Sequence, residues 1–146
     1  PNIFGVVGSK ANDIQPCKRM LSSMSTTMLL ADGEVAMVVG TRGGSTIFTS
    51  VFQTIGNVLD YGMSPVDAVA PTPFHHQRLP PDLITYSVTR PLPPATVSLL
   101  GEMGYRAEPH PWEFGDVQIV WQKDGAWLPA SDPRDRGDSR VIPIDD

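Results

Sequence analysis

Two apolar stretches of the chain are each interrupted by an Asp-Gly pair. Residues 26–30 (TTMLL) and 35–40 (VAMVVG) lie on either side of the first pair, at positions 32–33. Residues 117–131 (VQIVWQKDGAWLPAS) repeat the pattern around a second pair, at positions 124–125. Asp-Gly between strand-like runs is a strong signal for a two-residue hairpin turn. The pattern therefore predicts two β-hairpins.

From Ser45 onward the apolar positions recur every three or four residues, which is typical of one face of a helix. Gly62 is well suited to end this helix, because glycine adopts the left-handed conformation found just beyond many helix ends. The residues predicted to form the buried face are Ile47, Phe48, Val51, Phe52, Ile55, Val58 and Leu59. Those predicted to form the exposed face are Thr46, Thr49, Ser50, Gln53 and Asn57.

Two further helices are predicted downstream. Ser64 is a good N-cap for a short helix with Pro65 as its first residue and Asp67 in its first turn. Residues 94–103 form another helix that stops at Gly104. The proline-rich residues 71–94 between them are expected to be extended and rich in loops. Near the N-terminus, the GVV segment beginning at Gly5 is a candidate strand.

Hairpins mixed with helices favour an α+β fold with an antiparallel sheet. The 146 residues are enough for one domain, so residues 1–146 are predicted to be a single domain or a fragment of a larger one. A net charge of −5 argues against nucleic acid or an anionic membrane as the partner. No apolar run reaches the roughly 18 residues of a membrane span. The single cysteine, Cys17, excludes an internal disulfide and a cysteine-based zinc cluster.

Gly43 and Gly44 stand where a predicted strand gives way to the longest predicted helix. The first N–H groups of a helix have no internal partner, and the helix dipole makes that end positive. Bare glycines there would let an oxygen approach those N–H groups, either a phosphate or the oxyanion of a tetrahedral intermediate. A close crossing of helix and strand would also explain the pair, since any side chain would clash there. Nucleotide binding is disfavoured, because no lysine follows the glycines as a Walker loop requires.

The residues by themselves identify no catalytic group. Cys17 lies beside two cations but has no evident histidine partner, and no Gly-x-Ser-x-Gly elbow surrounds the hydroxyl-rich residues 22–27. His75 and His76 are neighbours, so on a strand they would point to opposite faces, and no third ligand lies nearby. We therefore expect the FHHQ segment to pack and hydrogen-bond, and we expect no metal and no cofactor.

Five segments then carry a resemblance in one order: PNIFGVVG, KRMLSSMS, GTRGGSTIFTSVFQTIGNVLDYG, FHHQRLPPDL and ASDPR. Together they resemble the C-terminal part of the small subunit of γ-glutamyltranspeptidases, and the similarity covers nearly the whole chain. The resemblance implies the αββα sandwich of the N-terminal-nucleophile hydrolases. It also implies a precursor that cuts itself to expose a threonine, which attacks γ-glutamyl amides such as glutathione and passes the acyl group to water or an amine.

The same resemblance assigns roles to two pairs of residues. Gly43 and Gly44 would supply the N–H groups of the oxyanion hole, and Ser22 and Ser23 would bind the α-carboxylate of the glutamyl donor. The nucleophilic threonine of the family lies upstream of PNIFGVVG, so this chain alone is predicted to be inactive. Its partners would be the large subunit and the upstream segment of the same precursor, with self-association as another outcome.

The chain departs from the family pattern at three positions. Met20 and Arg42 each replace a usual proline, and Pro73 replaces a usual arginine. These changes leave open an acylase or amidase of another specificity, and a non-catalytic domain that binds small anions at the glycine pair. Family members are often exported, which favours the periplasm or the outside of the cell, while the single cysteine is compatible with the cytoplasm as well.

Overall fold

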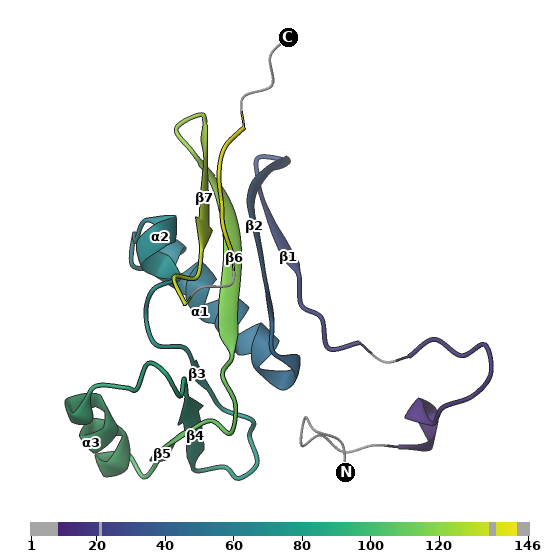
Figure 1. Cartoon of the computed structure of the whole chain (residues 1–146), viewed down its shortest axis with the longest axis vertical. Coiled ribbons are helices and arrows are strands. Elements are labelled where there is room, and N and C mark those ends of the chain that lie inside the picture. Colours follow the sequence, from purple (N-terminus) through teal and green to yellow (C-terminus); the bar gives the residue numbers. More distant parts are fainter. Residues whose placement is uncertain (1–8, 21, 135–136, 143–146) are drawn as a thin grey trace.

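The structure, a computed structural model, describes residues 9–20, 22–134 and 137–142. The described chain forms two small sheets with short helices packed against them (Figure 1). In chain order the elements are η1 (Lys10–Asn12), β1 (Thr27–Ala31), β2 (Glu34–Arg42), η2 (Gly44–Thr46), α1 (Ile47–Leu59), α2 (Pro65–Ala68), β3 (Phe74–His75), β4 (Leu83–Tyr86), α3 (Pro94–Glu102), β5 (Arg106–Pro109), β6 (Gly115–Lys123) and β7 (Ala126–Ser131).

The larger sheet has the strand order β1-β2-β6-β7, with every neighbouring pair antiparallel. Both predicted hairpins are confirmed. Asp32 and Gly33 have φ values of 52° and 87°, and Asp124 and Gly125 have φ values of 52° and 80°. Two consecutive residues with positive φ form the turn whose twist matches that of the flanking strands. The two hairpins pair through β2 and β6 in the middle of the sheet (Figure 1).

One face of this sheet carries the hydrophobic core, because α1 and α2 pack on it. Side chains alternate along a strand, so residues two apart in β2 and β6 point to the same face. The core therefore takes every second residue of each strand and the facing residues of the helices. Its members are Met37, Val39, Ile47, Val51, Val58, Ala68, Val69, Val117, Ile119 and Ala130. The predicted α+β class with an antiparallel sheet is confirmed.

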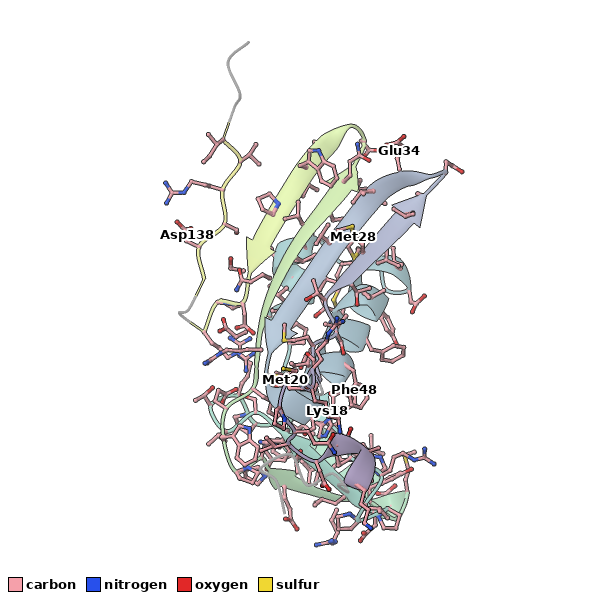
Figure 2. The ribbon with its side chains drawn as sticks, turned by 90° about the vertical axis from the view of Figure 1, so that its right-hand side faces the viewer. Lys18, Met20, Met28, Glu34, Phe48 and Asp138 are labelled. Atoms are coloured by element: carbon pink, nitrogen blue, oxygen red, sulfur yellow. The ribbon has the colours of Figure 1, made fainter. Side chains whose placement is uncertain are left out.

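The opposite face carries an apolar row that no helix of the described residues covers. Met28, Val38, Val120 and Pro129 pair across the four strands in one register. Met28 is 64% exposed and Val120 is 37% exposed. Of the described residues, the C-terminal stretch from Gly137 onward runs beside the sheet (Figure 2), and together with Met24 and Thr26 of the arm it borders this face. The sheet is thus buried on one side and largely open on the other.

The predicted buried face of α1 is partly wrong. Ser50 and Thr54 face the sheet and are buried, whereas Phe48 and Phe52 are 52% and 75% exposed. Ser50 and Thr54 donate their hydroxyls to carbonyls four residues earlier, so their burial leaves no polar atom unpaired. Phe48 projects beside the helix, clear of the sheet (Figure 2). The apolar stripe of α1 is wider than the surface that contacts the sheet. The small hydroxyl residues Ser50 and Thr54 lie where helix and sheet approach most closely.

Thr46 and Leu59 complete this correction. Thr46, predicted to be exposed, is fully buried, and Leu59, predicted to be buried, is 55% exposed. Beyond Leu59 the chain turns through Gly62, whose φ is +66°. The short helix α2 then begins as predicted, with the Ser64 Oγ accepting from the N–H of Asp67 at 3.2 Å.

The second sheet, β3-β4-β5, was not predicted. It forms within and after the proline-rich stretch, and its β4–β5 pair is parallel. Helix α3, which matches the predicted helix closely, links these two strands and packs against β5. The candidate strand beginning at Gly5 lies outside the described residues. Among the helices that the structure describes, none combines the length and apolarity needed to cross a membrane.

Candidate functional site

The turn between β2 and α1 is built on the predicted glycine pair. Gly43 has φ +139° and Gly44 has φ +61°, conformations that side chains rarely adopt. A Cβ on Gly43 would also collide with the hydroxyl of Thr46. That hydroxyl and the N–H of Thr46 both donate to the carbonyl of Gly43, at 3.0 and 3.2 Å. Glycine is therefore required at position 43 both by backbone geometry and by close packing.

Gly43 and Gly44 lie on a partly exposed turn. Among the described residues, no carbonyl or side chain accepts a hydrogen bond from the N–H of either of them. The chain continues through η2 directly into the 13 residues of α1, so the turn lies at the positive end of the longest helix. Unpaired N–H groups at the positive end of a helix are groups to which anions bind in other proteins.

Ser22 and Ser23 lie on an exposed, extended arm before β1 (Figure 1). Their hydrogen bonds are local. Ser22 Oγ accepts from the N–H of Met24 at 3.2 Å, and the carbonyl of Ser23 accepts from the hydroxyl of Ser25 at 3.5 Å. The described structure does not bring the two serines into contact with the glycine turn.

The arm and the turn nevertheless leave the sheet at the same end. Thr27 pairs with Val39, and the side chain of Thr26 lies against Gly40, near the end of β2. The serines therefore lie a few residues upstream of this rung and the glycines a few residues downstream of it. An open groove of about 740 Å³ borders this end and is lined by residues of the arm, β2, β6 and the C-terminal stretch.

A partly buried ionic cluster lies near Arg42 and Asp116, beside the turn. Arg134 pairs with Asp132, whose side chain is only 1% exposed, and with Glu113 at 2.5 Å. It also donates to the hydroxyl of Ser87 at 3.3 Å and to the carbonyl of Phe114 at 2.9 Å. The cluster joins the segment after β7 to the loop before β6.

The charges of this cluster stabilise one another. Burial by itself raises the pKa of Asp132, but hydrogen bonds from Arg134 outweigh it and hold this pKa below the usual range. Burial likewise raises the pKa of Glu113, and hydrogen bonds from Ser87 and Thr89 bring it below the usual range. Both carboxylates are therefore ionised at neutral pH, as the guanidinium of Arg134 requires.

The FHHQ segment packs and hydrogen-bonds as predicted. His75 is buried, 2.9 Å from the hydroxyl of Thr49 and 2.7 Å from the side-chain oxygen of Gln77. Burial lowers the pKa of His75, so its ring is neutral at physiological pH. In the described part of the chain, no group of three His, Cys, Asp or Glu residues is placed to hold a metal ion. Sequence reasoning missed His110, which stacks edge-on against Trp112 and Phe114 and carries no distinguishing sequence pattern.

A sequence profile described as Gamma-glutamyltranspeptidase matches residues 1–142. The chain belongs to this family. Glutathione hydrolase proenzyme from Pseudomonas aeruginosa is 48% identical over 141 residues, which is 97% of this chain and 25% of that protein. The proenzyme of the same name from Escherichia coli is 40% identical over 134 residues, or 92% of this chain and 23% of that protein. The chain thus spans about a quarter of these γ-glutamyltranspeptidase relatives.

Solved γ-glutamyltranspeptidases share the fold. The enzyme from Pseudomonas nitroreducens complexed with L-DON superposes with a TM-score of 0.89 at 48% identity, covering 97% of this chain and 74% of that one. This similarity confirms the family fold expected from the five sequence segments. The sandwich of the N-terminal-nucleophile hydrolases is therefore the architecture to which the open sheet belongs.

The three positions singled out by the sequence resemblance, Met20, Arg42 and Pro73, occupy different environments. Met20 lies on the exposed arm and is 83% exposed. Pro73 is buried, and its carbonyl accepts from the N–H of Ser87 at 3.1 Å. Arg42 ends β2 directly before the glycine turn and pairs with Asp116 at 2.9 Å. Of the three, only Arg42 adjoins the turn.

We predict that Asp132→Asn destabilises the complete protein by about 3 kcal/mol at neutral pH, because it removes a buried partner of a cation. The pKa of Asp132 is lower in the folded state than in the unfolded state, so its ionic contribution is present above about pH 4. This contribution is lost as the pH falls through the folded-state pKa. Guanidinium unfolding at a series of pH values measures the difference, which should shrink on acidification.

Asp138→Asn is the matched control for this measurement. Asp138 pairs with Arg140 at 2.7 Å, but the two side chains are 76% and 74% exposed. Exposed pairs contribute little to stability, so this variant should unfold like the parent. Equal losses in both variants, or a difference that grows on acidification, would contradict the assigned role of Asp132.

Proposed function

We propose that this chain is the part of a γ-glutamyltransferase or hydrolase that supplies the oxyanion hole and the donor-carboxylate site. The substrates would be γ-glutamyl amides such as glutathione, in keeping with the name glutathione hydrolase carried by its relatives. The observation that carries the proposal is the pair of N–H groups at Gly43 and Gly44, which have no acceptor among the described residues and lie at the positive end of α1.

The proposed reaction places these donors where charge develops. A threonine hydroxyl outside this chain attacks the γ-carbonyl carbon, and the carbonyl π electrons move onto oxygen. The N–H groups of Gly43 and Gly44 stabilise that oxyanion until the C–N bond breaks and the amine leaves with a proton. Water or an acceptor amine then attacks the acyl-enzyme, the same donors serve again, and the threonine hydroxyl is regenerated.

Ser22 and Ser23 would recognise the glutamyl group through its α-carboxylate. A hydroxyl donates one hydrogen bond, and a bond to a charged acceptor is stronger than a neutral one. Both serines are exposed and make only local hydrogen bonds among the described residues, so their hydroxyls are accessible. The arm that carries them leaves β1 at the end of the sheet where the glycine turn lies.

The remainder of the precursor is the proposed partner of the open sheet face. The row Met28, Val38, Val120 and Pro129 is apolar, partly exposed and continuous across four strands. In a sandwich, two sheets bury such faces against each other at about 10 Å. The exposed aromatic rings of Phe48 and Phe52 form a separate apolar surface on α1, on the other side of the sheet. The name proenzyme, carried by both relatives, denotes a precursor.

The oxyanion role is tested by replacing the peptide N–H of Gly44 with an ester oxygen by semisynthesis in the matured enzyme. The ester removes the donor while keeping the shape, so substrate binding should change little. Loss of one oxyanion donor lowers turnover by about a hundred- to a thousandfold. Steady-state kinetics on a chromogenic γ-glutamyl anilide measures the effect. Near-normal turnover of the ester variant, with unfolding of Gly44→Ala, would instead assign the glycines to packing.

The donor-carboxylate role is tested by the double variant Ser22→Ala and Ser23→Ala. Loss of a hydrogen bond to a charged group costs about 1.5–3 kcal/mol, or roughly ten- to a hundredfold in kcat/KM for a γ-glutamyl amide. The matching simple acyl amide lacks the α-carboxylate, so its slower hydrolysis should be unaffected. Equal losses on the two substrates would indicate a structural role for the serines. If the protein is instead an acylase of other specificity, the parent enzyme should already prefer the simple amide.

The proposal that the rest of the precursor covers the open sheet face is tested by Val120→Ala in the complete processed protein. If the second sheet buries Val120, the variant should lose about 1–3 kcal/mol of stability, which the partial exposure of Val120 in this chain would not explain. Val66→Ala is the control, because Val66 is 64% exposed on α2, away from this face. Guanidinium unfolding measures both, and equal small losses would show that the face stays open.

A further inference from the structure

The glycine turn is followed by one anchor and preceded by another. Downstream, Thr46 holds the carbonyl of Gly43 with two hydrogen bonds. Upstream, Arg42 is the last residue of β2, and its Nε donates to Asp116 Oδ2 at 2.9 Å. Asp116 lies on β6, the strand that pairs with β2. The guanidinium therefore ties the residue before the turn to the neighbouring strand.

Asp116 is itself held in place by the structure around it. Its φ is +62°, and it follows Gly115 with φ +98°, where the register between β2 and β6 shifts. Its N–H donates to Asp132 Oδ2 at 3.2 Å, and Asp132 is the buried partner of Arg134. The irregular backbone and the buried cluster together fix the carboxylate that Arg42 meets.

The pair between Arg42 and Asp116 is poorly suited to a role in global stability. The two side chains are 55% and 20% exposed, and exposed ion pairs contribute little to folding. Its location suits a local role. Gly43 and Gly44 are the most conformationally free residues that the chain can use, so two in succession would sample many orientations of their N–H groups. An oxyanion hole requires those donors to be fixed before the reaction.

We propose that Asp116 is a positioning residue for the turn: by holding Arg42, it fixes the orientation of the Gly43 and Gly44 N–H groups. This inference rests on the proposed oxyanion role of the two glycines. A proline at position 42 would fix φ through its ring without any partner. In this chain an ion pair between neighbouring strands restrains residue 42 instead. Asp116 then matters only while residue 42 is arginine.

The test is a double-mutant cycle in the complete matured enzyme, with Asp116→Ala placed in the parent and in Arg42→Pro. In the parent background, Asp116→Ala should lower kcat about tenfold, because small misplacement of fixed donors slows turnover, and should change KM less than twofold. In the Arg42→Pro background the same change should alter kcat less than twofold. Asp116→Glu should recover part of the parent kcat, since it restores the carboxylate.

Asp82→Ala is the matched control. Asp82 pairs with Arg106 Nε at the same 2.9 Å, on the second sheet, and the side chains are 44% and 55% exposed. This variant should leave kcat unchanged. Loss of kcat with Asp82→Ala, or an equal effect of Asp116→Ala in both backgrounds, would overturn the positioning role. A change confined to KM would overturn it as well, since Arg42 would then contact the substrate.

A second measurement is independent of activity and separates this inference from the proposed function. Millisecond hydrogen–deuterium exchange across residues 42–46 should be faster in Asp116→Ala than in the parent, and unchanged in Asp82→Ala. If the parent enzyme does not turn over γ-glutamyl anilide, the proposed function fails. The exchange experiment still tests whether Asp116 fixes the turn through Arg42. Unchanged exchange in Asp116→Ala would overturn the positioning role of Asp116 even in an active enzyme.

Discussion

The immediate passage from β2 into α1 is the constraint on which the rest of the structure depends. The strand ends at Arg42 and a 3-10 turn leads into the helix from Gly44, so the reversal falls on two residues. Gly43 and Gly44 make this reversal with positive φ values, which glycine adopts at the least energetic cost. The reversal lays α1 back across β2 and β6, where it contributes to the core. It leaves the positive end of the helix at the end of the inner strand β2.

The same geometry divides the apolar residues into two sets. Val39 and Ile119 meet α1, while Val38 and Val120, one position along in the same strands, face the other way. A strand that is apolar on both faces is typical of a sheet buried on both sides. The described chain covers only one of them. The apolar residues on the open face are therefore what a strand buried on both sides, as in the family's sandwich, would carry.

The most buried charges of the described chain lie near the turn and not in it. Arg134 pairs with Asp132, which follows β7, and with Glu113, which lies between β5 and β6. Asp132 in turn accepts a hydrogen bond from the backbone N–H of Asp116. Buried ionic groups of this kind contribute little net stability compared with apolar packing, but they require one arrangement of their partners. Here that arrangement ends beside the residue that precedes the glycines. The proposed oxyanion hole would thus be held by a cluster distant from it in sequence.

The sequence by itself determined the two hairpins, the three α-helices and the family. The Asp-Gly turns at residues 32–33 and 124–125, the N-cap at Ser64 and the glycine pair were all predictable, because each depends on the conformational preferences of a few adjacent residues. The family followed from five ordered segments. These features require no knowledge of which distant residues meet.

Only the tertiary structure decided which side of each element is buried and which charges meet. The stripe on α1 was too wide to identify its contact face, and the sheet selected Ser50 and Thr54 over Phe48 and Phe52 because small hydroxyl residues fit a close contact and bond their own helix. The parallel β4–β5 pair, and the pairing of Arg42 with a carboxylate 74 residues away, depend on how the chain returns to itself. Local preferences carry no information about such contacts, because the groups that form them are adjacent only after folding.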